Sequence, residues 1–136
     1  MSSSIDKMIA LAKETIQNSH CPYSHFPVTC VIRTKSDRYF LGVNMENSVN
    51  PDSICAEGVA LGAMITSGER EVAEILVYAS KDFKCFPCGG CRQKLAEFCR
   101  AETCVHVTNE YQGFIETRTL GELLPCSFTS DTMKEK

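Results

Sequence analysis

Cysteine and glutamate gather at two places in this 136-residue sequence where they could bind a metal ion and move protons. Cys55 and Glu57 stand two apart in ICAE, and Cys88 and Cys91 form the CxxC of PCGGC. Residues three apart share one face of a helix, so Cys88 and Cys91 can bind a single ion. CxxC by itself also fits a redox pair or half of a structural zinc site, but a structural site needs a second such pair, which the sequence does not contain.

The spacing of Cys55 and Glu57 predicts a helix that points its N-terminus at the metal. Two positions on a helix are about 200° apart, so the two side chains cannot face one partner sideways. At a helix end, Cys55 can bind the ion while Glu57 reaches past it. Three thiolates with one open position are typical of a catalytic zinc site, and an unligated glutamate beside it can carry protons. We therefore expect one Zn²⁺ held by Cys55, Cys88 and Cys91, with Glu57 as the catalytic residue, a pattern found in zinc deaminases.

The elements that must position these residues alternate between helices and strands. Apolar spacing and turn residues predict a first helix with Ser4 as its N-cap, a second helix with Ser53 as its N-cap and Gly68 near its end, and a hairpin around residues 35–37. The order α-β-β-α-β-α-β-β-α predicts an α/β fold of two or three layers with a mixed sheet. The expected helices lie within 2–19, 54–68, 88–99 and 120–125, and the expected strands cover 28–34, 38–44, 74–80, 103–109 and 114–119.

Composition narrows the class of protein. Hydrophobic residues make up 43% and charged residues 23% of the chain, which is typical of one globular domain; we expect that domain to cover 1–136, with 129–136 a frayed tail. The net charge of −3, with scattered basic residues, favours a small-molecule partner and no nucleic acid. Without a signal peptide or a long apolar run, we expect no membrane partner and a cytoplasmic location, where most of the nine cysteines stay reduced.

The chain resembles the small zinc-dependent cytidine deaminases. The motifs CPYSHFPV (21–28), GVNMEN (42–47), ICAE (54–57), PCGGCRQ (87–93), EF (97–98) and ELLPCSF (122–128) stand in the order of that family and at about its spacing. The resemblance runs from about residue 5 to residue 130. It implies a three-layer α/β/α sandwich around a mixed five-stranded sheet, and it implies hydrolytic deamination of cytidine or 2′-deoxycytidine in pyrimidine salvage.

The resemblance also assigns substrate contacts to five residues. Phe26 matches an aromatic residue that packs on the pyrimidine, and the Ala56 backbone matches the donor to its O2. Asn44 and Glu46 match the pair that holds the ribose 3′-hydroxyl. Phe128 matches an aromatic residue that a neighbouring subunit lends, since such enzymes are commonly homotetramers whose active sites are completed by neighbours. Glu57 matches the acid and base that moves protons between the attacking water, ring N3 and the leaving ammonia.

Several positions depart from the family and leave the substrate open. Gly58 stands where the family usually has arginine, and some deaminases of blasticidin S, which also lack that arginine, carry one inside their CxRC, where this chain has Gly90. Asn50 and Asp52 replace less polar residues; Asp52 either selects an amine-bearing substrate or supports capping beside Ser53. Arg92 could supply charge or brace the metal site. The alternatives are therefore a deaminase of a modified cytosine nucleoside and a catalytically silent zinc-binding module, against which the retained Glu57 argues.

Overall fold

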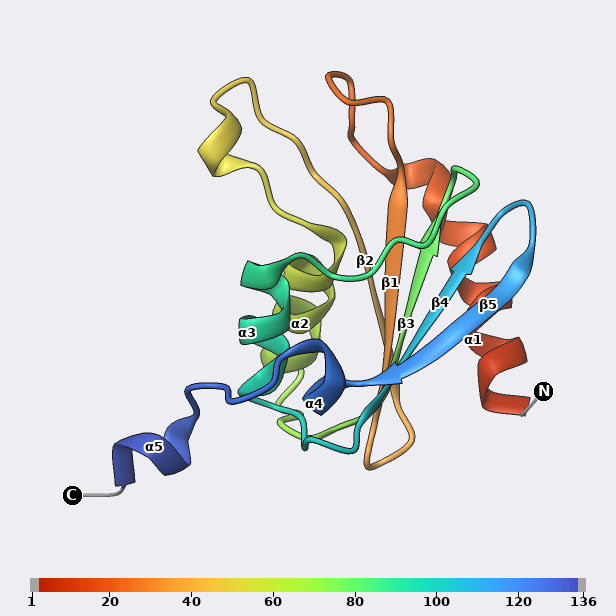
Figure 1. The fold of residues 1–136 in the computed structure, drawn as a ribbon. Coiled ribbons are helices and arrows are strands. Elements are labelled where there is room, and N and C mark those ends of the chain that lie inside the picture. The colour runs from red at the N-terminus through yellow and green to blue at the C-terminus, as the bar shows by residue number, and fades with distance from the viewer. Residues whose placement is uncertain (1–2, 135–136) are drawn as a thin grey trace.

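Five strands form a mixed sheet at the centre of the fold. The structure, a computed structural model, describes residues 3–134. The strands are β1 Val28–Thr34, β2 Tyr39–Val43, β3 Val72–Ala79, β4 Cys104–Asn109 and β5 Gly113–Thr119. They lie in the order β2-β1-β3-β4-β5 (Figure 1). β3 and β4 are parallel, whereas the other neighbouring strands are antiparallel.

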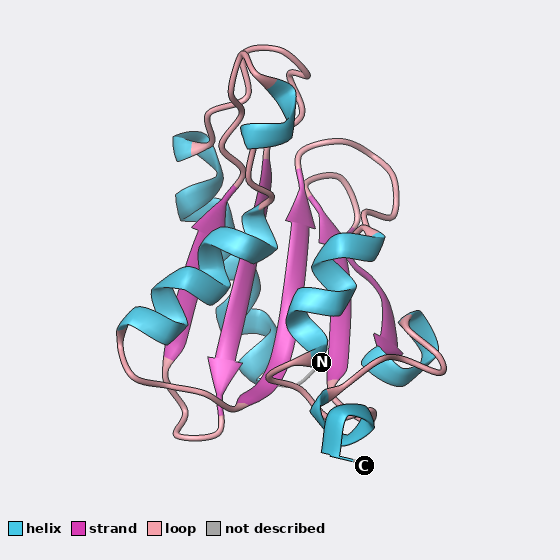
Figure 2. Cartoon of the chain, turned by 90° about the vertical axis from the view of Figure 1, so that its left-hand side faces the viewer, coloured by secondary structure: helices cyan, strands magenta, loops and turns pink. Residues whose placement is uncertain are grey.

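Helices cover both faces of this sheet. They are α1 Ser3–Thr15, α2 Ala56–Thr66, α3 Gly89–Ala96, α4 Leu120–Leu123 and α5 Ser130–Lys134, with 3₁₀ turns at Ile16–Asn18 and Asn50–Asp52. α1 packs on one face, while α2 and α3 lie side by side on the other (Figures 1 and 2). The three-layer α/β/α architecture and the mixed five-stranded sheet are therefore confirmed. Within residues 3–134, none of the helices has both the length and the apolar character needed to cross a bilayer.

The strands serve two separate hydrophobic cores because their side chains alternate between the faces of the sheet. Val31 and Leu76 point toward α1, and Ile32 and Ile75 point toward α2 and α3. All four side chains are fully buried. The central strands β1 and β3 therefore carry near-continuous apolar runs, as strands covered on both faces require.

The direction of the strands brings the loops that carry the motifs to one end of the sheet. β2 and β3 are both antiparallel to β1, so they run in the same direction and end at the same edge, where β1 begins. The segment 44–55 leaves β2 there and leads into α2, and the segment 80–88 leaves β3 there and leads into α3. The loop 20–27 enters β1 at that edge (Figure 1). Four of the quoted motifs, CPYSHFPV, GVNMEN, ICAE and PCGGCRQ, therefore meet at one edge of the sheet.

Two predicted helix caps are wrong, and one is confirmed. Ser4 lies inside α1 and not at its N-cap. α2 begins at Ala56 with Cys55 as its N-cap, two residues after the predicted Ser53, whose hydroxyl accepts a hydrogen bond from the backbone N–H of Asn47 instead. Gly68 does follow the end of α2, with a left-handed φ of 99° that glycine adopts without strain.

The C-terminal segment 129–136, expected to be a frayed tail, contains a short helix in the part that the structure describes. Residues 130–134 form the short helix α5, which projects away from the sheet and the other helices (Figure 1). The remainder of the predicted frayed tail, residues 135–136, lies outside the described residues. The single-domain boundary 1–136 stays an expectation.

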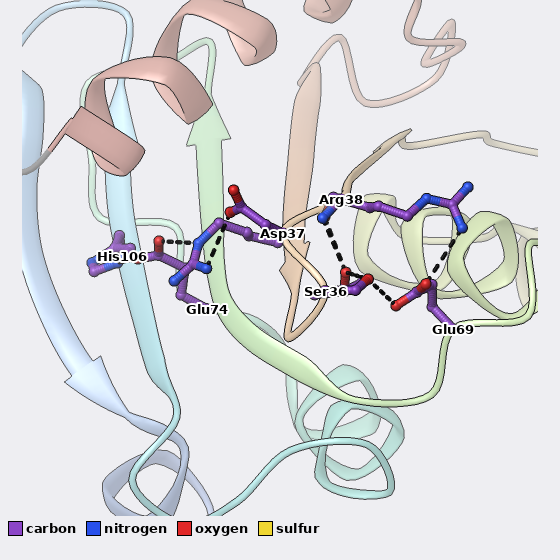
Figure 3. Close-up of polar contacts among 8 residues, drawn as sticks. Ser36, Asp37, Arg38, Glu69, Glu74 and His106 are labelled. Carbon is purple, nitrogen blue, oxygen red and sulfur yellow. Dashed lines mark hydrogen bonds and ion pairs between the residues drawn. The ribbon is translucent and has the colours of Figure 1, made fainter.

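A buried carboxylate connects four elements on the α1 side of the sheet. Glu74 of β3 accepts a hydrogen bond of 2.7 Å from Arg33 Nε and lies 2.6 Å from His106 Nε2 (Figure 3). His106 Nδ1 in turn lies 2.8 Å from the hydroxyl of Thr117. Burial alone would raise the pKa of Glu74, but hydrogen bonds involving Ser4, Arg33 and His106 outweigh it and lower the pKa below its ordinary value of 4.5. The folded protein therefore binds this proton more weakly than the unfolded chain does.

Glu74→Gln should lower the free energy of unfolding by about 3 kcal/mol at pH 7, because the variant leaves the buried partners without their carboxylate. Since the pKa of Glu74 is depressed in the fold, its stabilisation is present above the ordinary glutamate pKa and is lost as the pH falls through the lower folded pKa. The gap between variant and wild type should close on acidification below pH 4.5, as urea unfolding would measure. Glu69→Gln, at a more exposed carboxylate held by Ser36 and Arg38 (Figure 3), should cost less; equal stability of the Glu74 variant and wild type at pH 7 would contradict the role given to this network.

Candidate active site

Two helix N-termini and three thiols converge at the end of the sheet described above. Cys55 is the N-cap of α2, Cys88 is the N-cap of α3, and Cys91 lies in the first turn of α3. Their three sulfur atoms all lie within 4.8 Å of one another. Cys55 and Cys88 are exposed, whereas Cys91 is buried. The three predicted metal ligands therefore come together, with one side of the cluster open to a further ligand.

The surroundings of the thiols affect their protonation in different directions. A hydrogen bond with the Cys91 backbone is the main cause that lowers the pKa of Cys88 below that of a free thiol. Burial raises the pKa of Cys55 and of Cys91. A metal ion binds cysteine as the thiolate and displaces the proton, so a cation at this position would reverse the effect of burial on both groups.

The donor set fits a zinc ion. Three cysteine sulfurs are soft ligands that suit Zn²⁺ and do not suit Mg²⁺ or Ca²⁺, which prefer oxygen. Three protein ligands with an accessible fourth position match a catalytic zinc site more closely than a structural one, which is closed by four. All nine cysteines are free thiols, so no disulfide competes for these sulfurs.

Glu57 lies in the first turn of α2, two residues after Cys55, and its exposed fraction is 5%. Burial raises the pKa of its carboxyl group above the ordinary value, although the Glu57 amide and the charge of Lys94 act in the opposite direction. A carboxyl group whose pKa is raised above its ordinary value holds a proton more readily, which suits a group that takes up and releases a proton in turn. Its neighbour Ala56 is fully buried and presents an amide of the first helical turn, where N–H groups have no partner within the helix.

Asn44 and Glu46 follow β2 and both hold the loop that precedes β1. The Asn44 amide accepts from the Val28 N–H at 3.1 Å and donates to the Phe26 carbonyl at 2.8 Å. One oxygen of Glu46 accepts from the backbone N–H groups of Tyr23 (3.0 Å) and Ser24 (3.1 Å). Hydrogen bonds involving Ser24 are the largest cause that lowers the pKa of Glu46, which keeps it an acceptor. These two side chains fix the loop that contains Phe26.

Phe26 belongs to an aromatic pair that sequence reasoning missed. Its ring centroid lies 4.9 Å from that of Phe83, and Lys81 Nζ lies 5.7 Å from the Phe26 ring. Phe83 is about half exposed. Both new residues come from the segment between β3 and α3, far from Phe26 in sequence, so spacing gave no signal for them; an exposed phenylalanine in a loop just before the CxxC was the only hint.

Hydrogen bonds tie the Arg92 side chain to two backbone carbonyls, and the Phe128 backbone to a side chain of α3. Arg92 donates from Nε to the Pro87 carbonyl at 2.6 Å and from Nη1 to the Leu123 carbonyl at 2.8 Å. Because Pro87 directly precedes Cys88, this arginine braces the loop that carries the thiols. Phe128 is 60% exposed, and its carbonyl accepts from Gln93 Nε2 at 2.8 Å. Within residues 3–134 of this single chain, the Phe128 side chain is thus left largely uncovered.

The remaining predicted positions lie on the approach to α2. Asn50 and Asp52 bound an exposed 3₁₀ turn. Asp52 cannot cap α2, because the helix begins only at Ala56; the capping interpretation is wrong. Gly58 lies in the first turns of α2, where a Cβ would stand 3.2 Å from Ile54 Cγ2 and 3.9 Å from Lys94 Nζ.

This fold and these thiols define the class of the protein. The model of the cytidine and deoxycytidylate deaminase zinc-binding region matches residues 2–108. The chain belongs to this family of zinc-binding deaminases. The match covers all three thiols, Glu57 and the loops that meet at the edge of the sheet.

The sequences and structures of individual relatives match nearly the whole of this chain. A cytidine deaminase from Halalkalibacterium halodurans is 39% identical over 92% of this chain and 96% of its own. The crystal structure of cytidine deaminase from Burkholderia pseudomallei superposes with a TM-score of 0.85 at 31% identity, covering 94% of this chain and all of the other. A blasticidin-S deaminase from Bacillus cereus is 26% identical over 90% of this chain and 91% of its own.

Proposed function

We propose that this chain catalyses the hydrolytic deamination of cytidine and 2′-deoxycytidine to uridine and 2′-deoxyuridine, with release of ammonia. The observation that carries the proposal is the cluster of three thiols within 4.8 Å of one another beside the buried carboxylate of Glu57. Identity of 39% to a cytidine deaminase supports the choice of nucleoside.

In the proposed mechanism, the three thiols bind the metal and Glu57 transfers the protons. Cys55, Cys88 and Cys91 would hold Zn²⁺, which when bound makes water a nucleophile near neutral pH. Glu57 takes the proton that the attacking water gives up and passes it to ring N3 as oxygen bonds to C4. It then helps to move the second proton to the exocyclic amine, which leaves as ammonia while C4 becomes a carbonyl. The raised pKa of Glu57 suits a group that accepts and donates in turn.

The remaining residues would hold the nucleoside in place. Phe26, whose ring is fixed by Phe83, provides an apolar wall for the uncharged pyrimidine. The Ala56 amide donates to the pyrimidine O2. Asn44 and Glu46 bind the ribose 3′-hydroxyl with the donor and acceptor capacity that their loop contacts leave free.

The proposal includes the oligomeric state of the protein and its cellular location. Phe128, exposed in the single chain, would complete the site of a neighbouring subunit in a homotetramer. The exposed apolar side chains of Val49 and Ile54 near the start of α2 support burial against another copy. Nine free thiols suit the reducing cytoplasm, where the reaction would serve pyrimidine salvage. Light scattering by the zinc-loaded protein measures the assembly.

Zinc-loaded protein should convert cytidine to uridine, and removal of the metal should abolish that turnover, because the nucleophile depends on the metal. The loss of cytidine absorbance in the ultraviolet measures the reaction, and zinc added to the depleted protein should restore it. Zinc-replete protein that turns over neither cytidine nor 2′-deoxycytidine would refute the proposed substrates.

A second candidate keeps the reaction and changes the substrate to a modified cytosine nucleoside. It is favoured by Asp52 in the exposed turn before α2 and by the 26% identity to a blasticidin-S deaminase. Including blasticidin S in the same assay separates the two candidates by their kcat/KM values. The silent zinc-binding module has less support, since a buried glutamate without a proton to move would be a cost to the fold.

A further inference from the structure

The proposed zinc centre has a charge imbalance that the chain must offset. Three thiolates and one divalent cation sum to about −1. The N-termini of α2 and α3 contribute roughly half a positive charge each. The Arg92 guanidinium already donates hydrogen bonds to the backbone carbonyls of Pro87 and Leu123. A further cation close to the thiols would stabilise the metal-bound state.

Lys94 is placed to provide that charge. It follows Cys91 by three residues on α3, which puts both on one side of the helix. Its Nζ lies 3.9 Å from the point that a Cβ on Gly58 would occupy. Gly58 itself is three residues after Cys55 on α2. The ammonium group therefore lies in the seam between the two helices that carry the thiols, directly over a position with no side chain.

The surroundings of Lys94 favour this placement. The seam is a groove of about 580 Å³ whose walls include Ile54, Leu61 and Phe98, so the methylene chain of the lysine can pack while the charged end stays solvated. Lys94 belongs to none of the ion pairs found among residues 3–134.

We propose that Lys94 offsets the negative charge of the three-thiolate zinc centre, reaching it through the space that Gly58 leaves open. The inference rests on the zinc site of the proposed function. Lys94 touches neither the substrate nor the metal; it acts through the thiolates and is a positioning residue. Gly58 and Lys94 thus act together: Lys94 of α3 supplies the positive charge, and the absence of a side chain at Gly58 of α2 leaves space for it.

Lys94→Met should weaken zinc binding about tenfold, at the lower end of the effect of losing a group just outside a metal's ligands, whereas Lys94→Arg should bind zinc like the wild type. Competition with a chromogenic chelator measures the affinity, and the thiolate-to-cobalt charge-transfer bands of the Co²⁺-loaded protein show that all three sulfurs still bind. The deficit should shrink at high salt, because Lys94 is exposed and screened. Lys13→Met, which removes an exposed charge from α1 on the far face of the sheet, is the matched control and should leave zinc affinity unchanged.

The double variant Gly58→Arg with Lys94→Met separates charge from packing. The arginine brings a guanidinium into the same seam, and its Cβ would stand 3.2 Å from Ile54 Cγ2, so this methyl group has to shift by only a few tenths of an ångström. Most of the lost affinity should return. Wild-type affinity in Lys94→Met, or a double variant that binds zinc no better than Lys94→Met, would overturn the proposal. These equilibrium measurements need no turnover, so an inactive protein with normal zinc affinity would count against the proposed reaction and not against Lys94.

Discussion

Glu57→Gln should lower kcat for cytidine by roughly a thousandfold or more, while zinc content and fold stay those of the wild type. The substitution keeps the shape and burial of the side chain and removes its capacity to take up a proton. General acid–base catalysis typically contributes 10² to 10⁴ in rate, and here one carboxylate serves both the attack on C4 and the departure of ammonia. Turnover, zinc content and thermal unfolding of the same preparations measure the three quantities.

The same substitution should leave stability unchanged or slightly raised. Burial raises the pKa of Glu57, which means that the fold disfavours its charged form, and a neutral amide avoids that cost. Glu14→Gln, at an exposed carboxylate of α1, is the control and should change neither activity nor zinc content. A Glu57→Gln enzyme with wild-type kcat would move the proton transfer to another group and remove the main support for the proposed mechanism.

The convergence of the thiols was predictable because it follows from local rules. Residues two apart cannot share a helix face, so Cys55 and Glu57 could serve one site only from a helix end. The structure has Cys55 and Cys88 as the N-caps of α2 and α3. Likewise, the strand predicted at 28–34 has the same bounds as β1, because its β-branched residues end at the turn residues 35–37 of a hairpin.

The errors arose where a tertiary contact overrides a local preference. Ser53 is a better capping residue than cysteine by propensity, yet α2 starts at Ala56. The Ser53 hydroxyl already accepts a hydrogen bond from the backbone N–H of Asn47. In addition, Met45 pairs with Ile54 through two backbone hydrogen bonds. The chain therefore stays extended through Ile54, and the helix can begin only after it.

The residues that sequence analysis missed all contact partners that are far away in the sequence. Phe83 meets Phe26 from another loop, and Lys94 meets the position of Gly58 from another helix. Neither pair has a spacing that a periodic pattern could reveal. Gly58 is a visible departure from the family motif, but its consequence depends on the residue that faces it from α3, which only the packing of the two helices defines.

Gly42 illustrates the same limit and carries the second large effect. It lies in β2, paired with Cys30 of β1, and α2 crosses directly over it. A Cβ at this position would stand 2.3 Å from the Ala60 nitrogen and 2.4 Å from the Ala56 carbonyl oxygen. Both are backbone atoms of α2 and cannot rotate away. The missing side chain thus allows the first turns of α2, and with them Cys55, to lie against the sheet.

Gly42→Ala should lower the free energy of unfolding by about 3 kcal/mol, at the upper end of the usual cost of overpacking, and lower the melting temperature by roughly 10 °C. Because the helix must move as a body, zinc affinity should fall as well. Gly62→Ala is the matched control in α2: its Cβ would meet nothing within 4 Å, and alanine should stabilise the helix by about 0.5–1 kcal/mol. Calorimetry and zinc titration of the two variants should therefore give shifts of opposite sign in stability. Wild-type stability in Gly42→Ala would mean that α2 can slide on the sheet, and the close packing of this helix could then no longer explain how Cys55 and Glu57 are held.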